Sequence, residues 1–236
     1  GFYQTFAQSF AATRRRVQPG VRRVLASLPP TGRWLDLGCG SGALAAAWAE
    51  SGRQGLYHGL DFSPGLLAEA RAALEDLPHP GLEIRYDLAD LSAPDWSAML
   101  DGQIYNGILA FAVLHHLPSA ALRLDVVRRA AALLPSGGRF IHSEWQYQHS
   151  PRLMARQLPW STVGLQNEQL EEGDTLLDWR YALPGQPEQT GLRYVHLFSR
   201  AELLALAENC GFMIESEFES DGEGGNLGLY QFWQGS

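Results

Sequence analysis

Three closely spaced glycines preceded by an acidic residue form the part of this sequence best suited to bind a ligand. Asp36 comes two residues before Gly38, and Gly40 and Gly42 follow at every second position. The run follows an apolar segment of strand length and opens a helical pattern, so the backbone can approach a ligand where helix-terminal N–H groups are exposed. We therefore expect an anionic or zwitterionic ligand at this turn.

Acidic residues near the loop indicate which ligand it holds. Asp61 ends the next apolar segment, where a carboxylate can accept both hydrogen bonds of a ribose diol. The glycine spacing also satisfies the looser dinucleotide pattern, which leaves an NAD-dependent oxidoreductase as an alternative. Asp36 favours S-adenosylmethionine, because its carboxylate can meet the ammonium of the methionine moiety but would repel a pyrophosphate. A cap of the loop without ligand contact is the alternative for Asp36.

The elements that would position these residues follow the rhythm of a parallel sheet with crossover helices. Ser63 before Pro64, and Ser119, are placed to cap two of the helices. The carboxyl ends of parallel strands meet at one edge of a sheet, so residues that follow the strands should share a site. Apolar segments of strand length lie at residues 33–37, 55–60, 82–87, 104–111 and 139–144.

Segments outside this core complete the expected organisation. Apolar residues recur at helical spacing before Pro29, which indicates an amphipathic helix packed on the sheet. Residues 146–195 mix tryptophans, prolines and glycines without sustained periodicity, and we interpret them as an insertion or lid. Ser199 opens a capping box with Glu202, and two strands near 212–218 and 227–233 close the chain.

With this arrangement the sequence resembles the class I S-adenosylmethionine-dependent methyltransferases. The resemblance implies an α/β, Rossmann-like fold with a mostly parallel seven-stranded sheet and helices on both faces. It implies one methyltransferase domain over 1–236, divided into an N-terminal lid or helix (1–30), a cofactor-binding core (31–145), an insertion or substrate lid (146–195) and a C-terminal helix with closing strands (196–236).

The same resemblance implies that S-adenosylmethionine is the cofactor and indicates which residues bind it. Asp61 would hold the ribose, and Asp87 and Leu88, with Asp90 nearby, would face the adenine. Loop capping is the alternative for both Asp87 and Asp90, and Phe111 is equally suited to the core. The cofactor-binding residues expected in this way are Tyr3, Arg14, Asp36, Gly38, Cys39, Gly40, Gly42, Asp61, Phe62, Asp87, Leu88, Asp90, Ala110 and Phe111.

Both ends of the chain are similar to the tRNA wobble-uridine carboxymethyl methyltransferases, which esterify the carboxylate of 5-carboxymethyluridine. The similar parts are the Y-x-x-x-A-x-x-F-x-x-T-R pattern from Tyr3 to Arg14 and the R-Y-V-H-L-F run at 193–198. By this likeness Tyr3 and Arg14 would close over the cofactor. Gln18 and Leu227 depart from the family pattern, where tryptophan is usual. The methyl acceptor is therefore left open between tRNA and a small metabolite.

Two histidines are the candidate general bases. The sulfonium methyl is already activated, so a carboxylate acceptor needs no base, whereas an alcohol or amine acceptor does. His115 and His116 follow the 104–111 segment, with packing or a helix start as the alternative role, and Arg14 is a candidate to orient an acid. Further residues that are suited to contact substrate are His142, Glu144, Trp145, Arg193 and His196.

The net charge and the pattern of cysteines and histidines limit the classes of partner that the protein can bind. A net charge of −8 opposes polyanion binding, apart from a basic patch at Arg14, Arg15, Arg16, Arg22 and Arg23. The two cysteines are not paired in sequence, and no histidine or cysteine spacing predicts a metal site. We expect a cytoplasmic protein with no membrane span, signal peptide or metal, whose partner is a methyl acceptor; the oligomeric state is left open.

Overall fold

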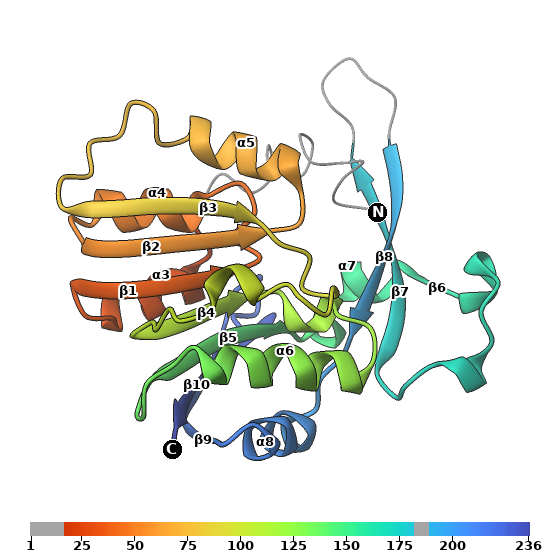
Figure 1. Ribbon diagram of the computed structural model, residues 1–236. Helices are drawn as coiled ribbons and strands as arrows, with labels where there is room; N and C mark the ends of the chain where they lie inside the picture. Colours follow the sequence, from red (N-terminus) through yellow and green to blue (C-terminus); the bar gives the residue numbers. More distant parts are fainter. Residues whose placement is uncertain (1–16, 182–188) are drawn as a thin grey trace.

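The computed structural model describes residues 17–181 and 189–236, and a seven-stranded sheet forms its centre (Figure 1). The strands lie in the order β3-β2-β1-β4-β5-β10-β9. The first five run parallel, and β10 runs antiparallel to both of its neighbours. They are β1 (Thr31–Leu37), β2 (Gln54–Asp61), β3 (Leu82–Leu88), β4 (Gly107–Phe111), β5 (Arg139–Trp145), β9 (Phe212–Ser220) and β10 (Gly228–Gly235).

Helices cover both faces of this sheet. Strand residues alternate between the faces, so Trp34 packs with one group of helices while Leu35 packs with the other. The first group is α3 (Pro19–Ser27), α4 (Ala43–Glu50) and α5 (Pro64–Ala72), and the second is α6 (Ala120–Ala132) and α8 (Arg200–Asn209). The predicted Rossmann-like fold is confirmed. Chain order reverses between β1 and β4, the place where open α/β sheets bind ligands.

Local signals set most of the element boundaries. The hydroxyls of Ser63, Ser119 and Ser199 each accept a backbone N–H at the start of a helix, as predicted. The predicted 104–111 strand is wrong at its beginning, because Ile104 is exposed and β4 starts only at Gly107. At α8 only one half of the capping box forms. The carboxylate of Glu202 reaches His196 and Arg123 instead of its own helix terminus.

The segment after β5 holds more order than its sequence indicates. A three-stranded antiparallel sheet, in the order β6-β7-β8, stands beside the carboxyl ends of the main sheet (Figure 1). In β7 the consecutive residues 176–179 are all buried, so no period of two appears in the sequence. The segment after β5 contains η3 (Tyr147–His149), α7 (Pro151–Met154), β6 (Gln157–Leu158), η4 (Trp160–Val163), η5 (Asn167–Gln169), β7 (Asp174–Tyr181) and β8 (Gln189–His196).

No helix in the described part of the chain combines the length and the apolar character needed to cross a bilayer.

Two short helices of the main domain remain to be described. They are η1 (Ala98–Leu100) and η2 (Leu114–His116), and η2 follows β4 directly. The second of them carries both candidate catalytic histidines, so its placement matters for the site.

Helix α3 is held at its start by a residue from the opposite end of the chain. One carboxylate oxygen of Asp221 accepts the N–H of Gly20 at 2.9 Å, and the other accepts the hydroxyl of Tyr230 at 2.5 Å. A Cβ at Gly20 would lie 2.3 Å from the Tyr230 ring, so glycine permits this close approach. Asp221 therefore ties α3 to the β9–β10 turn.

Replacing Asp221 by alanine should lower the free energy of unfolding by about 1 to 2 kcal/mol, since it removes a cap and leaves a tyrosine hydroxyl without its acceptor. Urea denaturation would measure the change. Asp76→Ala, at an exposed aspartate, is the matched control. Equal stability of the two variants would show that Asp221 does not anchor α3.

Candidate functional site

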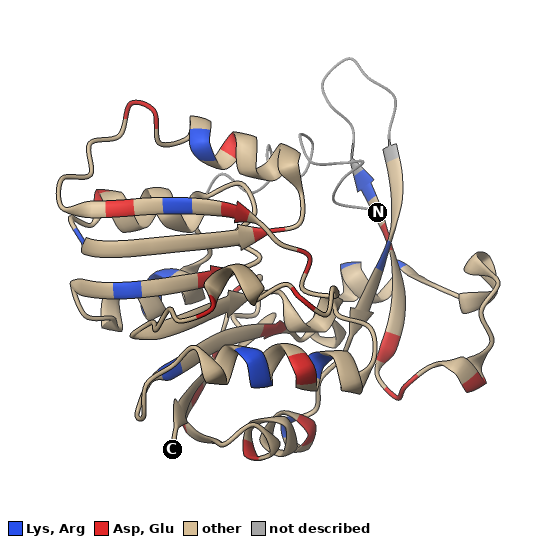
Figure 2. Ribbon diagram, viewed as in Figure 1, with Lys and Arg blue, Asp and Glu red and all other residues tan. Residues whose placement is uncertain are grey.

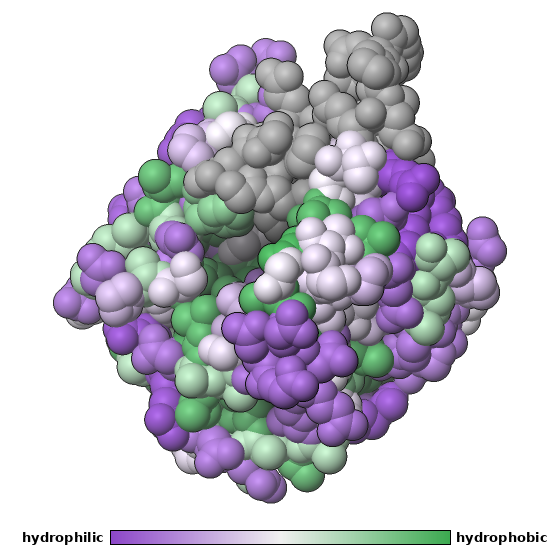
Figure 3. Space-filling model, turned by 90° about the vertical axis from the view of Figure 1, so that its right-hand side faces the viewer, coloured by the Kyte–Doolittle hydropathy of each residue, from purple (hydrophilic) through white to green (hydrophobic). Residues whose placement is uncertain are grey.

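A cavity of about 480 Å³ opens at the carboxyl ends of the parallel strands. Figure 3 looks onto this side of the molecule, where hydrophobic surface borders part of a central hollow. The predicted residues that line the cavity are Asp36, Gly38, Cys39, Gly40, Asp61, Phe62, Asp90, Phe111, His116 and Trp145. The structure thus brings together residues from the turns after β1, β2, β3 and β4.

The glycine turn after β1 is shaped by steric limits. Gly38 and Gly42 have φ of 69° and 79°, in the left-handed region that favours glycine. A Cβ at Gly38 would lie 2.7 Å from Val113, and one at Gly42 would lie 2.8 Å from Ala70. Gly42 is the N-cap of α4 and does not itself line the cavity. Its role is to let the turn pack tightly against α5.

Asp61 fixes the glycine turn from the end of β2. One oxygen of its carboxylate accepts the N–H of Gly40 and the other accepts the N–H of Ser63, both at 2.9 Å. Burial raises the pKa of Asp61, while these backbone hydrogen bonds oppose the rise. Each carboxylate oxygen has more than one acceptor position, so Asp61 keeps capacity to bind a diol. Asp61, the residue expected to hold a ribose, therefore fixes the conformation of the glycine turn.

Asp36 places a second carboxyl group in the same cavity. Its side chain is buried and accepts a hydrogen bond from the hydroxyl of Tyr57 on β2. Burial raises the pKa of Asp36 to about 7, and the charge of Asp61 adds to this while the Tyr57 hydroxyl opposes it. Within residues 17–181 and 189–236 neither Asp36 nor Asp61 forms an ion pair with a basic side chain. A cation entering the cavity would relieve this deficit of positive charge.

The acidic residues after β3 divide into two roles. Asp87 does not line the cavity; its half-exposed carboxylate lies 2.8 Å from Nε2 of His58. Leu88 is 54% exposed and also lies outside the lining. Asp90 does line the cavity, while it accepts the N–H and hydroxyl of Ser92 as a loop cap. Of the three residues predicted on the adenine side, only Asp90 therefore lines the cavity.

The two histidines after β4 face different surroundings. His116 lines the cavity, and its Nδ1–H donates to the carbonyl of Tyr194 on β8 at 3.0 Å. A carbonyl can only accept, so in the neutral ring Nε2 is the unprotonated nitrogen. His115 lies in the interior, with Nδ1 2.8 Å from Glu144. Ala110 is fully buried in β4 and does not line the cavity, whereas Phe111 does.

A buried polar cluster supports the wall formed by Trp145. The carboxyl group of Glu144 contacts the backbone N–H and Nδ1 of His115 and, through its other oxygen, Nδ1 of His142 at 2.9 Å. Burial raises the pKa of Glu144 well above its usual value and lowers the pKa of His142 to about 3. Both groups are therefore biased toward their neutral forms. His115 in turn stacks on Trp145, which lines the cavity.

Several apolar residues of the wall were not predicted as site residues. Val17 and Val21 have the spacing of a core-facing helix, and their stripe also faces the cavity. Nothing in the sequence distinguishes these two uses of an apolar face. The unpredicted lining residues are Val17, Gln18, Val21, Ser41, Ala43, Leu44, Leu66, Ala89, Leu91, Ser92, Ala112, Val113, Leu117 and Pro118.

Charge around the cavity is acidic. Figure 2 shows acidic residues at the carboxyl ends of β2 and β3, and none of the described lining residues is a lysine or arginine. The guanidinium of Arg193 lies 4.5 Å from the ring centroid of Trp145, next to the wall but outside the lining. Of the expected basic patch, Arg23 packs over Phe218 at 4.0 Å. Tyr3 and Arg14 lie outside the described residues.

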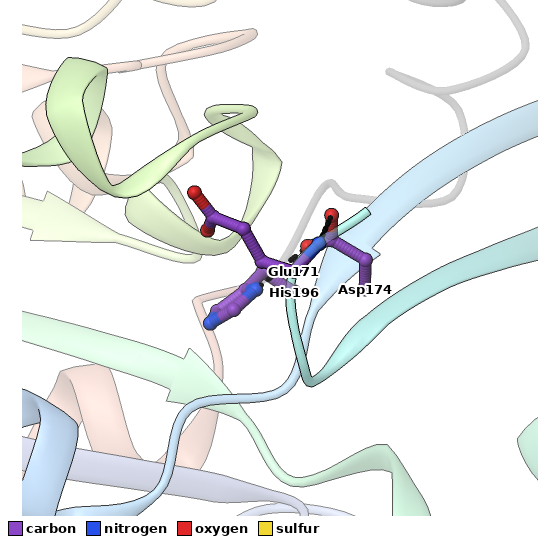
Figure 4. A group of neighbouring side chains, drawn as sticks. All are labelled: Glu171, Asp174 and His196. Carbon is purple, nitrogen blue, oxygen red and sulfur yellow. Dashed lines mark hydrogen bonds and ion pairs between the residues drawn. The ribbon is translucent and has the colours of Figure 1, made fainter. Parts of the chain in front are cut away.

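One further group has side chains of the types that ligate metals. Glu171, Asp174 and His196 bring a ligand atom each to within 4.8 Å of one another, between β7, β8 and the loop before them (Figure 4). Their atoms already bind one another and Arg123. A guanidinium inside the group disfavours a second cation there.

Comparison with known proteins places this geometry in a family. Residues 7–217 match the family model described as a methyltransferase domain. A protein of Encephalitozoon cuniculi named as a methyltransferase is 29% identical over 215 residues, which cover 90% of this chain and 86% of that protein. Aklanonic acid methyltransferase of a Streptomyces species is 35% identical over 123 residues, which span 51% of each protein.

The fold is shared with solved structures. A crystal structure of an S-adenosylmethionine-dependent methyltransferase from Clostridium acetobutylicum aligns with a TM-score of 0.69 at 14% identity, and the alignment covers 100% of both chains. At this identity the likeness establishes the fold and no more.

Replacing Asp36 by asparagine should raise the free energy of unfolding at pH 8 by about 1 to 4 kcal/mol and leave it little changed near pH 4. The folded state holds the Asp36 proton up to a pKa of about 7, above the value of 3.8 of an unperturbed aspartate, so wild-type stability falls as pH rises between these values. Urea denaturation at both pH values would test this, with Asp76→Asn as the control. Parallel pH profiles for wild type and Asp36→Asn would contradict it.

Proposed function

The chain belongs to the methyltransferase domain family, and from this membership we propose that it methylates an oxygen atom of a small, largely apolar molecule. It is an enzyme, with S-adenosylmethionine as its cofactor. The observation that carries the acceptor proposal is a cavity that runs from the glycine turn to an aromatic wall and whose described lining contains no lysine or arginine. The relative named for aklanonic acid supports a small-molecule acceptor.

The residues present fit the cofactor by their chemistry. Asp36 is a buried carboxyl group that lacks a basic partner among the described residues, which suits the ammonium of the methionine moiety. The backbone of the glycine turn suits its carboxylate, and Asp61 suits the ribose hydroxyls. The loop from Ala89 to Ser92 would line the adenine side. When bound, the cofactor supplies a methyl group on a positively charged sulfur.

The protein's own contribution is to exclude water, orient the acceptor and accept its proton. Phe111, Leu117 and Trp145 form an apolar wall that favours desolvation of the acceptor. His116 is the general base in this proposal, since Nε2 of its neutral ring is the unprotonated nitrogen and the residue lines the cavity. When the acceptor oxygen takes the methyl group that the bound cofactor would supply, its proton would pass to Nε2 of His116, and the leaving sulfur would keep the electron pair.

A carboxylate acceptor, as in tRNA carboxymethyluridine, is the second candidate function. What favours it is Arg193, whose cation lies against Trp145 at the cavity wall and is suited to orient an acid. This acceptor would need no base. The acidic surface around the strand ends disfavours a large polyanion, so a small carboxylic acid fits this variant better than tRNA does.

Methyl transfer from labelled S-adenosylmethionine tests these proposals directly. The acceptors are a panel of phenols, alcohols and small carboxylic acids, with bulk tRNA as a parallel substrate. Label in a hydroxyl compound supports the proposed function, and label in a carboxylic acid supports the second candidate. Label found only in tRNA would overturn the small-molecule proposal.

Asp61→Ala should weaken binding of S-adenosylhomocysteine by about 1 to 3 kcal/mol, because it removes a charge-assisted acceptor and loosens the glycine turn. Isothermal titration calorimetry measures the change. Asp87→Ala is the matched control, an acid at the neighbouring strand end that lies outside the cavity. A larger loss for Asp87→Ala than for Asp61→Ala would reassign the site.

His116→Gln should lower kcat for a hydroxyl acceptor by about two to four orders of magnitude with little change in cofactor affinity, since it removes the base and keeps a similar volume. Steady-state kinetics at saturating cofactor would show this. His149→Gln, at an exposed histidine, is the control. An unchanged kcat would exclude His116 as the base.

A further inference from the structure

His196, at the end of β8, lies between two carboxylates. Its Nδ1 is 2.8 Å from Oδ1 of Asp174 on β7, and its Nε2 is 2.8 Å from Oε1 of Glu202 on α8. The ring is 1% exposed. Figure 4 shows His196 directed at Asp174 across the start of the β7–β8 hairpin. This arrangement joins the three-stranded sheet to a helix of the main domain.

The geometry sets the charge of His196. A neutral imidazole carries one N–H, whereas two carboxylate acceptors at hydrogen-bond distance require two donors. Burial lowers the pKa of His196, but the hydrogen bonds to Glu202 and Asp174 outweigh it, so the net pKa is raised above 6.5. Burial alone would raise the pKa of Asp174, but hydrogen bonds from Tyr194, His196 and the N–H of Glu171 lower it. His196 is thus an imidazolium between two anions.

Charged groups from every neighbouring element face this junction. Arg123 of α6 pairs with Glu171 and lies 3.4 Å from Glu202. The hydroxyl of Tyr194 donates to Asp174 at 2.6 Å. Three carboxylates are therefore matched by two cations, Arg123 and His196. An imidazolium has no lone pair for a metal, so the group shown in Figure 4 functions as an ion-pair junction.

The junction is connected to the cavity through β8. Tyr194, two residues before His196, binds Asp174 through its hydroxyl, while its backbone carbonyl accepts Nδ1–H of His116. That carbonyl sets both the orientation and the tautomer of the cavity histidine. A shift of β8 relative to α8 would move the carbonyl away from His116.

We propose that His196 is a positioning residue, which as an imidazolium clamped by Asp174 and Glu202 holds β8 so that the Tyr194 carbonyl orients His116. The inference rests on the proposed function, in which His116 is the base. It assigns the three-stranded sheet a role in positioning the catalytic group. The clamp depends on one proton, so it has a defined pH range.

The sign of the pH dependence follows from the two pKa shifts. The contribution of His196 is complete below its unfolded value near 6.5 and is lost as pH rises through its raised folded value. The contribution of Asp174 is lost when pH falls through its lowered value. The clamp is therefore intact from mildly acidic pH up to about 6.5 and opens as pH rises through the raised pKa of His196.

Glu202→Gln tests the clamp, because it keeps the size of the side chain and removes one of the two anions that favour the imidazolium. We expect the pKa of His196, followed by NMR of its ring nitrogens in the intact chain, to fall by about one unit. In the pH profile of kcat, the decline on the high-pH side should shift to lower pH by the same amount. Glu215→Gln, which removes a surface ion pair with Arg139, is the matched control.

The measurements distinguish a failure of the His196 clamp from a failure of the proposed function. The His116 ring signals should lose the Nδ1–H tautomer as His196 loses its proton, a readout that needs no turnover. Linked titration of the two histidines supports the clamp even if no tested acceptor is methylated, in which case only the proposed function fails. A neutral His196 at pH 6 overturns the clamp. A fall in the His196 pKa that leaves the His116 tautomer and the kcat profile unmoved overturns the positioning role.

Discussion

Two carboxyl groups buried side by side at the ends of β1 and β2 are the constraint on which the site depends. Asp61 binds the backbone of the glycine turn and of the helix start that follows β2, so it fixes the shape of the cavity floor. Asp36, hydrogen-bonded by Tyr57, keeps an acidic proton up to a pKa of about 7 because burial opposes its charge. Together they make a rigid, electron-rich surface suited to a cationic, ribose-bearing ligand.

The three-stranded sheet supports the side of the cavity that lies opposite the two carboxyl groups. Main-sheet elements supply the side of the cavity proposed to hold the cofactor, whereas β8 reaches the opposite side through Arg193 over Trp145 and the Tyr194 carbonyl on His116. Behind the wall, Glu144 and its two histidine partners form a nearly neutral polar cluster that fixes η2 against β5. The side of the cavity proposed to hold the acceptor is therefore built by contacts between segments far apart in the chain.

The parts of the site that could be predicted from the sequence are those that local geometry decides. The turn with Gly38 and Gly42 needs positive φ and close packing, and Asp61 follows the apolar segment that forms β2. Each of these features can be recognised from the few residues around it. Which acid after β3 enters the cavity depends on the partner of Asp87, His58, which lies on a neighbouring strand. The same limit applies to His115, whose burial follows from Glu144 on β5. The β7–β8 pairing was hidden because four consecutive buried residues show no strand period.

The central claim, that a sulfur-bearing nucleoside binds with its amino group at Asp36, is tested most directly by calorimetric titration with S-adenosylhomocysteine at pH 6 and pH 8. The account predicts saturable binding that weakens by about tenfold from pH 8 to pH 6, since Asp36 must release its proton to accept the ammonium. NAD should give no heat of binding. Equal affinity for S-adenosylhomocysteine at both pH values, or saturable binding of NAD in its place, would contradict the account.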